Sequence, residues 1–415
     1  MKLITGHIAA SLASLTLLGL PLMASAENVK IAYIDPLSGA FAPVGQSQLK
    51  TWEAMAAVGN QRKWAGANTF EIVGFDNKGS PQESLTQLKA IIDQGYRYIA
   101  QGNGSGVAGA LIDAINKHNE RNPGKEIVFL NYAAVDPDLT NSKCSFWHFR
   151  LDANSDMKME ALTTFMAKDM SIKKVYIIGQ NYAHGQQVTR AAKEFLKRKR
   201  PDIQIVGDDL HPIAQVKDFS PYVAKIKASG ADTVITGNWG ADLALLIKAA
   251  KDADLKANFY TYYGATTGVP TAMGAAGADR VKIVAYWHPN NETFSGHELA
   301  AAYKKKYNDD LTTVAIYSGL ELLGQAMKNA NSTDPVKVAF AMEGLKVTSL
   351  NGEVEMRKSD HQLQQPLYIA TWSKVDGKTV KYDQENTGYG WKTDQKIDTY
   401  VATQPTSCQM KRPAK

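Results

Sequence analysis

The chain alternates short runs of β-branched and aromatic residues with longer amphipathic runs, and it does so twice over. In the first series the short runs are VKIAYID, FEIVGFDN, YRYIAQGN and EIVFLNY, which begin at Val29, Phe70, Tyr96 and Glu126. The second series begins at Lys173 with KKVYIIGQN and continues through IQIVGDDLH, ADTVITGNW and ANFYTYYG. Alternation of strand-length and helix-length apolar patterns is typical of parallel sheets covered by helices on both faces. The sequence therefore predicts an α/β protein with two doubly wound parallel-sheet lobes.

The N-terminus has the pattern of a secretory leader. Lys2 provides a positive start, IAASLASLTLLGLPL is an apolar segment too short to span a membrane, and Ala24-Ser25-Ala26 matches a cleavage site. We expect residues 1–26 to be removed and the mature chain to be a free protein of a bacterial periplasm. No cysteine follows the cleavage site, so a lipid anchor is not expected.

Composition and charge exclude several classes of protein. The formal net charge of +6 is modest and spread along the chain, which does not favour a nucleic-acid partner. None of the eight histidines has the spacing of a metal site, and neither a metal nor a cofactor is predicted. The two cysteines, Cys144 and Cys408, form an even pair in an oxidising compartment. They predict one disulfide that ties the C-terminal tail to the body, and two reduced thiols are the alternative.

The stretch GSGVAG, from Gly104 to Gly109, has the spacing of a dinucleotide-binding turn. It follows the third predicted strand rather than the first, and the next strand ends in Asn131-Tyr132 instead of the acid that holds a ribose. Without a side chain, Gly104 lets the free N–H groups of a helix start point at an anion, and Ser105 adds a hydroxyl. A carboxylate fits such a cradle as well as a phosphate does.

Several phrases resemble the periplasmic leucine/isoleucine/valine-binding protein family, the type I solute-binding proteins of ABC importers. The markers are IDPLSGAFAPVG, FDNKGSPQESL, GNGSG, YAAVDPDLT, VKDFSPYVAKIKASGADTV and AIYSGLELLGQAM. The resemblance implies a ligand carboxylate bound by Ser105 and by the loop at Ala133, Ala134 and Val135. It also implies a membrane permease as partner, a monomer, and binding without catalysis.

Departures from the family pattern bear on the choice of ligand. Val135 stands where the family has a threonine, and His184 replaces a tyrosine before Gly185, whereas the aromatic Trp239 is retained. The acid that binds the ligand's ammonium group aligns with Tyr263. Because an unpaired buried ammonium is costly, this predicts a ligand without an α-amino group, unless Asp242 provides the missing anion.

Aromatic residues gather at the predicted strand ends. They are Phe41, Tyr132, Trp239, Tyr262 and Tyr263. Such a set suits a flat ring, and we expect His184, with a pKa near neutrality, to donate to a carboxylate or phenol. An aromatic carboxylate and an amino acid are thus both open as ligands. The alternative for each aromatic residue is ordinary packing.

An enzyme is the rival interpretation, in the form of a periplasmic hydrolase that uses the same cleft with His184 as base. No G-x-S-x-G elbow and no paired nucleophile support it. Asp35, Asp76 and Asp152 follow strands, where acids usually serve turns or caps. No membrane-spanning segment is expected after the leader, which argues against a receptor ectodomain.

The order of the predicted elements also implies a hinge. We expect the first lobe to comprise residues 27–150 and 287–350 and the second to comprise 151–286 and 351–395, with a tail at 396–415. Three crossings, near Leu151, Trp287 and Leu350, would then allow the lobes to close on a ligand.

Overall fold

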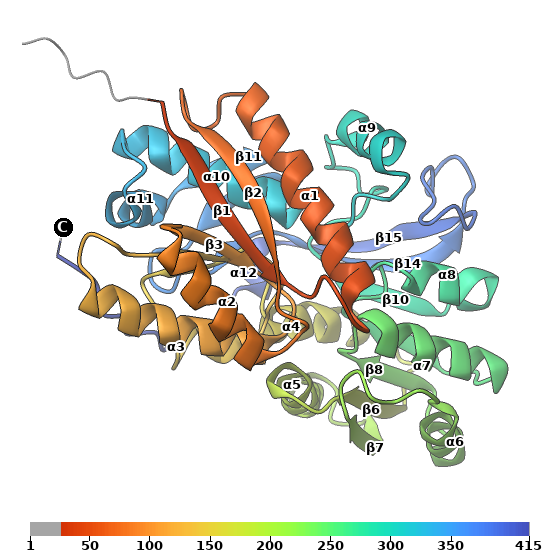
Figure 1. Ribbon diagram of the computed structural model, residues 1–415. Helices are drawn as coiled ribbons and strands as arrows, with labels where there is room; N and C mark the ends of the chain where they lie inside the picture. The colour runs from red at the N-terminus through yellow and green to blue at the C-terminus, as the bar shows by residue number, and fades with distance from the viewer. Residues whose placement is uncertain (1–25, 415) are drawn as a thin grey trace, which may run out of the picture.

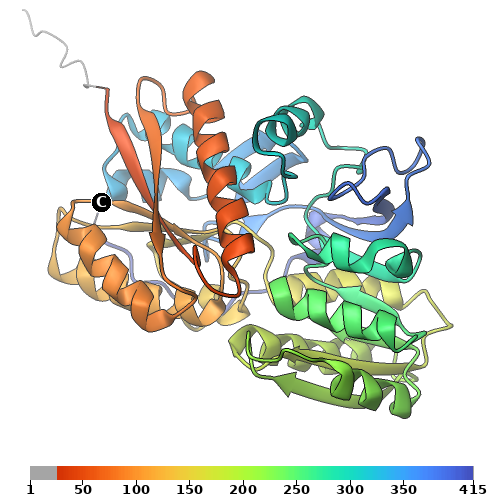
Figure 2. The same cartoon turned by 45° about the vertical axis from the view of Figure 1, so that its right-hand side comes forward.

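The computed structural model describes residues 26–414, which form two α/β lobes lying side by side (Figures 1 and 2). The first lobe is built on a five-stranded sheet in the order β2-β1-β3-β4-β5, with every strand parallel. Its strands are β1 (Asn28–Asp35), β2 (Thr69–Asp76), β3 (Tyr98–Gln101), β4 (Val128–Asn131) and β5 (His148–Arg150). Its helices are α1 (Ala42–Gln61), α2 (Pro81–Asp93), α3 (Ser105–Arg121), the short 3-10 helix η1 (Pro137–Thr140), α9 (His297–Tyr307), α10 (Ala315–Ala330) and α11 (Pro335–Met342).

The second lobe is built on a seven-stranded sheet in the order β15-β14-β10-β9-β8-β6-β7. Its strands are β6 (Lys174–Gln180), β7 (Gln204–His211), β8 (Thr233–Thr236), β9 (Asn258–Thr261), β10 (Val281–Ala285), β14 (Leu367–Lys374) and β15 (Tyr389–Ile397). Its helices are α4 (Ser155–Met166), α5 (Ala183–Lys199), α6 (Ser220–Ser229), α7 (Gly240–Asp252), α8 (Val269–Met273), the 3-10 helix η2 (Gly274–Gly277) and α12 (Thr399–Ala402).

The predicted α/β class with two parallel-sheet lobes is confirmed. Helices cover the sheets, with α1 packed against α10 and α2 against α3 in the first lobe (Figure 1). The central strands β3 and β4 are buried along their whole length, as expected for strands covered on both faces. The second sheet departs from a purely parallel arrangement, because β14 and β15 pair antiparallel at its edge.

Local sequence explains where several helices begin and end. Ser80 caps α2, since its Oγ accepts a hydrogen bond from the Glu83 N–H at 3.4 Å, and Pro81 occupies the first helical position, where no N–H is needed. Gly230 ends α6 with φ of +68°, in the left-handed region that glycine enters without a steric penalty.

A third, small antiparallel sheet corrects the predicted position of the last crossing. It consists of β11 (Lys346–Ser349), β12 (Gly352–Met356) and β13 (Leu363–Gln364). Gln362 pairs with Arg150 at the end of β5, and His361 stacks on Phe149 with ring centres 4.1 Å apart. Residues 351–364 therefore lie with the first sheet, and the chain enters the second sheet only at Leu367 rather than near Leu350. A continuous β-rich pattern could not show which sheet these strands join.

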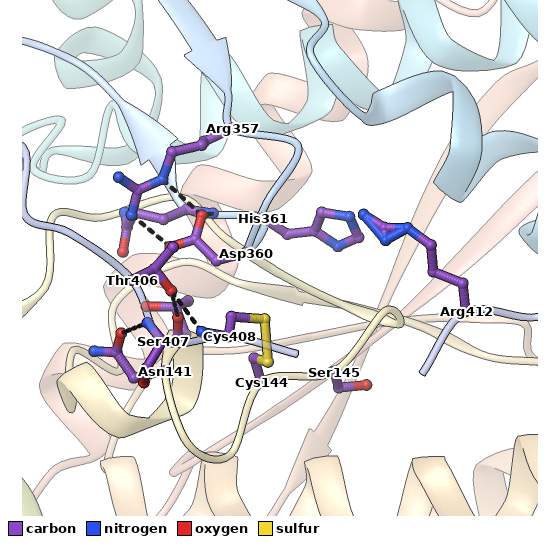
Figure 3. The surroundings of a disulfide bond; sticks show 12 residues. Asn141, Cys144, Ser145, Arg357, Asp360, His361, Thr406, Ser407, Cys408 and Arg412 are labelled. Atoms are coloured by element: carbon purple, nitrogen blue, oxygen red, sulfur yellow. Dashed lines mark hydrogen bonds and ion pairs between the residues drawn. A yellow bond between two sulfur atoms is a disulfide. The ribbon is translucent and has the colours of Figure 1, made fainter. Parts of the chain in front are cut away.

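The ends of the chain require separate comment. The predicted leader lies outside the described residues except for Ala26. No helix within residues 26–414 is long and apolar enough to cross a membrane. The tail after β15 returns to the first lobe, where Cys408 forms a disulfide with Cys144 and their Cα atoms are 5.7 Å apart (Figure 3).

Candidate ligand-binding site

A cleft lies where the carboxyl ends of strands from both lobes meet. It consists of two adjoining cavities whose linings share Val44, Gln48, Ala133, Tyr263 and Thr266. The smaller cavity is lined by Gly104, Ser105, Ala133, Ala134, Val135, His184, Trp239 and Tyr263 among others. The larger is lined by Tyr132, Ala133, Tyr262 and Tyr263 among others. Of the predicted site residues, only Phe41 lines neither cavity.

The loop after β3 borders the smaller cavity, at the place where the glycine pattern predicts an anion cradle. The buried Asp35 carboxylate at the end of β1 accepts hydrogen bonds from the N–H groups of Gly102 and Asn103, each at 2.9 Å. Gly104 has φ of +94° and directly precedes α3, whose first-turn N–H groups have no partner within the helix. Ser105 begins α3 and lines the smaller cavity, and its Oγ accepts a hydrogen bond from Asp136 N at 3.2 Å.

The buried Asp35 carboxyl group makes the free energy of unfolding depend on pH. Burial raises its pKa to about 7, although hydrogen bonds from Tyr132 and from the loop N–H groups lower it in part. The unfolded pKa is about 3.9. Between about pH 4 and about pH 7 the folded state therefore binds more protons than the unfolded state, and this contribution to stability is lost as the pH rises through that window.

The quantity to compare is the free energy of unfolding of the natural protein minus that of the Asp35→Asn variant. We expect this difference to be smaller at about pH 7.5 than at about pH 5. Urea titrations at both pH values measure it. Asp218→Asn is the control: hydrogen bonds from Ser220 lower the pKa of Asp218, so this acid titrates below the window and its difference stays constant. If the difference for Asp35→Asn is equally constant, the pKa of Asp35 is not raised in the folded protein.

The predicted anion donors at Ala133 and Ala134 are occupied by another partner. Both N–H groups donate to Asn131 Oδ1, at 3.3 and 2.8 Å. These residues line the cleft with their small side chains, but their N–H groups are not free for a ligand. The carbonyl of Val135 accepts a hydrogen bond from Ser155 N at 2.9 Å and lies 3.0 Å from Ser155 Oγ. The Ala133 and Ala134 N–H groups therefore do not have the role predicted for them, whereas the predicted role of Ser105 and the N-terminus of α3 stays a prediction.

His184 does not have the properties predicted for it. Burial lowers its pKa to about 3, so the ring is neutral at physiological pH. Its Nε2 lies 3.1 Å from the carbonyl oxygen of Gly237, and its Nδ1 lies 2.8 Å from Ser155 Oγ. A neutral imidazole that donates from Nε2 and accepts at Nδ1 satisfies both contacts. With both nitrogens occupied, His184 packs in the wall of the cleft instead of donating to a ligand.

The pairing of Ser155 with His184 also bears on the hydrolase alternative. A serine next to a histidine is the usual nucleophile and base of covalent hydrolysis. Here the serine is fully buried, the group beyond the histidine is a carbonyl rather than a carboxylate, and the low pKa makes the imidazole a weak base at neutral pH. The geometry does not support hydrolysis. Residues 26–414 also contain no group of three or more His, Cys, Asp or Glu side chains suited to a metal ion.

Two of the predicted aromatic residues contact each other rather than an open space. Phe41, at the start of α1, stacks on Trp239, at the start of α7, with ring centres 3.9 Å apart. Trp239 Nε1 donates to the Tyr182 hydroxyl at 2.9 Å. Because Phe41 and Trp239 belong to different lobes, their stack is a contact between the lobes. Phe41 lines neither cavity, so its predicted place in the cleft is corrected, whereas Trp239 lines the smaller cavity.

The predicted tyrosines divide between structural and cleft roles. The Tyr132 hydroxyl donates to Asp35 Oδ2 at 2.6 Å in the interior of the first lobe. The Tyr262 hydroxyl donates to the carbonyl of Ser155 at 2.8 Å. Tyr263 lines both cavities and remains the aromatic residue best placed to contact a ligand.

Sequence reasoning missed two charged residues of the cleft. Asp152, interpreted as a turn or cap acid, lines the larger cavity together with Lys158. Asp242, the suggested substitute for the missing acid, instead accepts hydrogen bonds from Gln180 Nε2 and Ala214 N, at 2.8 and 2.9 Å, and is not in the lining of either cavity. An acid at a lobe crossing followed six residues later by a lysine was the only available signal.

Comparison with known proteins identifies the family. The sequence model described as "Periplasmic binding protein" matches residues 28–379. A Leu/Ile/Val-binding protein homolog 4 from Brucella abortus (strain 2308) is 35% identical over 412 residues, which cover 94% of each chain. The chain belongs to the periplasmic binding protein family. The predicted resemblance to leucine/isoleucine/valine-binding proteins is thereby confirmed.

Solved structures extend the comparison of this binding protein. A leucine-, isoleucine-, valine-, threonine-, and alanine-binding protein from Brucella ovis, in a closed conformation, is 32% identical and has a TM-score of 0.80, covering 94% of this chain and all of its own. A solute-binding protein of an ABC transporter from R. palustris, in complex with 4-hydroxybenzoate, is 22% identical with a TM-score of 0.75, covering 90% of this chain and 97% of its own. The second comparison shows the fold alone.

Proposed function

We propose that this protein is the periplasmic solute-binding component of an ABC importer and that it captures a small carboxylate-bearing ligand in the cleft. The observation that carries the proposal is the start of α3: Ser105 lines a cavity between the two lobes, and the first-turn N–H groups of a helix have no partner within it. The ligand is an amino acid or an aromatic acid. The relatives named above favour amino acids, and no cofactor is required.

The proposed mechanism is hinge closure. The first lobe binds the carboxylate at Ser105 while the lobes are apart, and the second lobe then swings in until Trp239 meets Phe41. The chain crosses between the sheets after β5, after β10 and before β14, and these three connecting segments form the proposed hinge. The closed form is the one we expect to dock, as a monomer, on its permease.

A thermal-shift screen of the mature protein, refolded free of carried-over ligand, tests the proposed function. One panel contains branched-chain and other amino acids, and the other contains benzoates and cinnamates. A ligand that binds only the folded state raises Tm with the logarithm of its concentration over Kd. Stabilisation by one panel identifies the ligand class, and no stabilisation by either contradicts the proposal.

Ser105→Ala is expected to weaken binding of the carboxylate ligand by about 1 to 3 kcal/mol, since a buried charge then lacks one hydrogen bond. Isothermal titration calorimetry measures the effect. Ser220→Ala is a matched control, because Ser220 also begins a helix, α6, but is exposed and away from the cleft. Unchanged affinity in the Ser105 variant would remove the cradle assignment.

A further inference from the structure

A buried ion pair lies in the wall of the larger cavity. Asp152 follows β5 at a crossing between the lobes, and Lys158 is in the first turn of α4. Asp152 Oδ2 is 2.7 Å from Lys158 Nζ, and the two side chains are only 3% and 2% exposed. Both residues are in the lining of the cavity.

The pair is held on the lysine side by aromatic residues. Lys158 Nζ lies 4.5 Å from the centre of the Tyr263 ring and 3.5 Å from the Tyr263 hydroxyl. It lies 6.0 Å from the centre of the Tyr262 ring. A cation over aromatic faces is attracted to them, and the attraction grows when water is excluded. The lysine thus fixes one oxygen of the carboxylate and is itself fixed.

The other carboxylate oxygen is left without a partner. Asp152 Oδ1 is buried and accepts no hydrogen bond from any described residue. A carboxylate can accept about four hydrogen bonds, and a buried oxygen that makes none costs free energy. Burial raises the pKa of Asp152, and the Lys158 ammonium lowers it in part. Asp152 Oδ1 is thus an acceptor that Lys158 holds in place and that no group within residues 26–414 uses. This indicates that the donor comes from a ligand.

The ion pair and the proposed anion cradle lie in the linings of adjoining cavities. Ser105 lines the smaller cavity and Asp152 the larger, while Gln48, Ala133 and Tyr263 line both. A small ligand that occupies the cleft can therefore place its carboxylate at Ser105 and a second polar group towards Asp152. A carboxylate only accepts hydrogen bonds, so that second group must be a donor.

We propose that Asp152 Oδ1, positioned by Lys158, accepts a hydrogen bond from an ammonium or hydroxyl group of the ligand and so selects carboxylates that carry such a donor. This inference rests on the proposed function and narrows its ligand class. It also removes the reason for excluding an α-amino group, because Asp152 supplies the acid that the alignment at Tyr263 lacked.

Two ligand pairs that differ only in the donor test the inference. L-Leucine is compared with 4-methylpentanoate, and 4-hydroxybenzoate with benzoate, by calorimetry on the natural protein. In the pair that binds, we expect the member with the donor to bind at least about 100-fold more tightly, because a site built for a hydrogen bond rejects the analogue that lacks it. The pair that binds distinguishes an ammonium from a hydroxyl.

The variant Asp152→Leu/Lys158→Met removes both charges, so that no lone buried charge remains. We expect its preference for the donor-bearing member to fall to within about threefold, with the affinity for the other member unchanged. Asp152→Ala/Lys158→Met, which also removes the acceptor and both charges, serves the same purpose if the first variant does not fold. The control is Lys248→Met/Asp252→Leu, an exposed pair on α7 that should leave the preference intact.

The outcomes separate this inference from the proposed function. If carboxylates bind the natural protein with no preference for the donor, or if the cleft variant weakens both members equally, the inference is wrong and the proposed function stands. If no member of either pair binds, the ligand class of the proposed function is wrong and the inference is wrong with it. Ser105→Ala should weaken both members of a pair equally, because both carry the carboxylate.

Discussion

Gly185→Ala is expected to destabilise the protein by about 3 kcal/mol. Gly185 lies in the first turn of α5, and a Cβ at this position would be 1.8 Å from the carbonyl oxygen of Gln180 and 2.9 Å from its carbonyl carbon. These are backbone atoms at the end of the buried strand β6, so no side chain can move aside. Overpacking of a tight interior costs about 1 to 3 kcal/mol, and contact with backbone places this variant at the upper limit. Urea unfolding measures the loss.

Gly106→Ala is the matched control for this prediction. Gly106 is also in the first turn of a helix, α3, but it is exposed and a Cβ there meets nothing within 4 Å. Alanine has the higher helix propensity, so we expect a gain of up to about 1 kcal/mol. A loss below about 1 kcal/mol for Gly185→Ala would mean that α5 can shift away from β6 without cost.

The same close approach occurs in the first lobe and explains why the fold could be predicted. A Cβ on Gly45 of α1 would lie 1.9 Å from the carbonyl oxygen of Pro36, just after β1. The first strand of each lobe is thus followed by a tight turn and by a helix that packs against the strand end through a glycine. Such units depend on local apolar periodicity and turn residues, which the sequence displays directly. The strands of both series were therefore predicted nearly where they lie.

The parts of the site that were mispredicted depend on distant partners. Ser105 lies in the lining of the cleft as expected, because its place after β3 follows from topology and from a glycine turn. His184 was assigned a pKa near neutrality, but its state is set by Ser155 and by the Gly237 carbonyl, which come from other segments. Likewise, nothing in the sequence distinguishes Asp152, an acid in the cleft, from the many acids that cap turns. Burial and hydrogen-bond partners decide these roles, and both arise only in the folded chain.

Removal of the disulfide by Cys144→Ser/Cys408→Ser is expected to lower the free energy of unfolding by about 2 to 5 kcal/mol. The two cysteines are 264 residues apart in the sequence, so the bond closes a very long loop in the unfolded chain. In the folded protein the tail is also held by other contacts: Thr406 Oγ1 donates to the carbonyl of Thr140 at 2.8 Å, Ser407 N donates to Asn141 Oδ1 at 3.1 Å, and Arg412 forms an ion pair with Glu343 (Figure 3). Thermal and urea unfolding with and without reductant measure the change.

The disulfide should affect stability without affecting the ligand. Cys144 is in the loop between η1 and β5 of the first lobe, and neither cysteine is in the lining of the two cavities. We therefore expect ligand affinity in the double variant to stay within about threefold of the natural value. Ser407→Ala, next to Cys408, keeps the backbone donor and should change stability by less than about 0.5 kcal/mol. If reductant leaves the natural protein as stable as before, the tail does not constrain the unfolded chain; if affinity falls with stability, the tail also controls closure of the lobes.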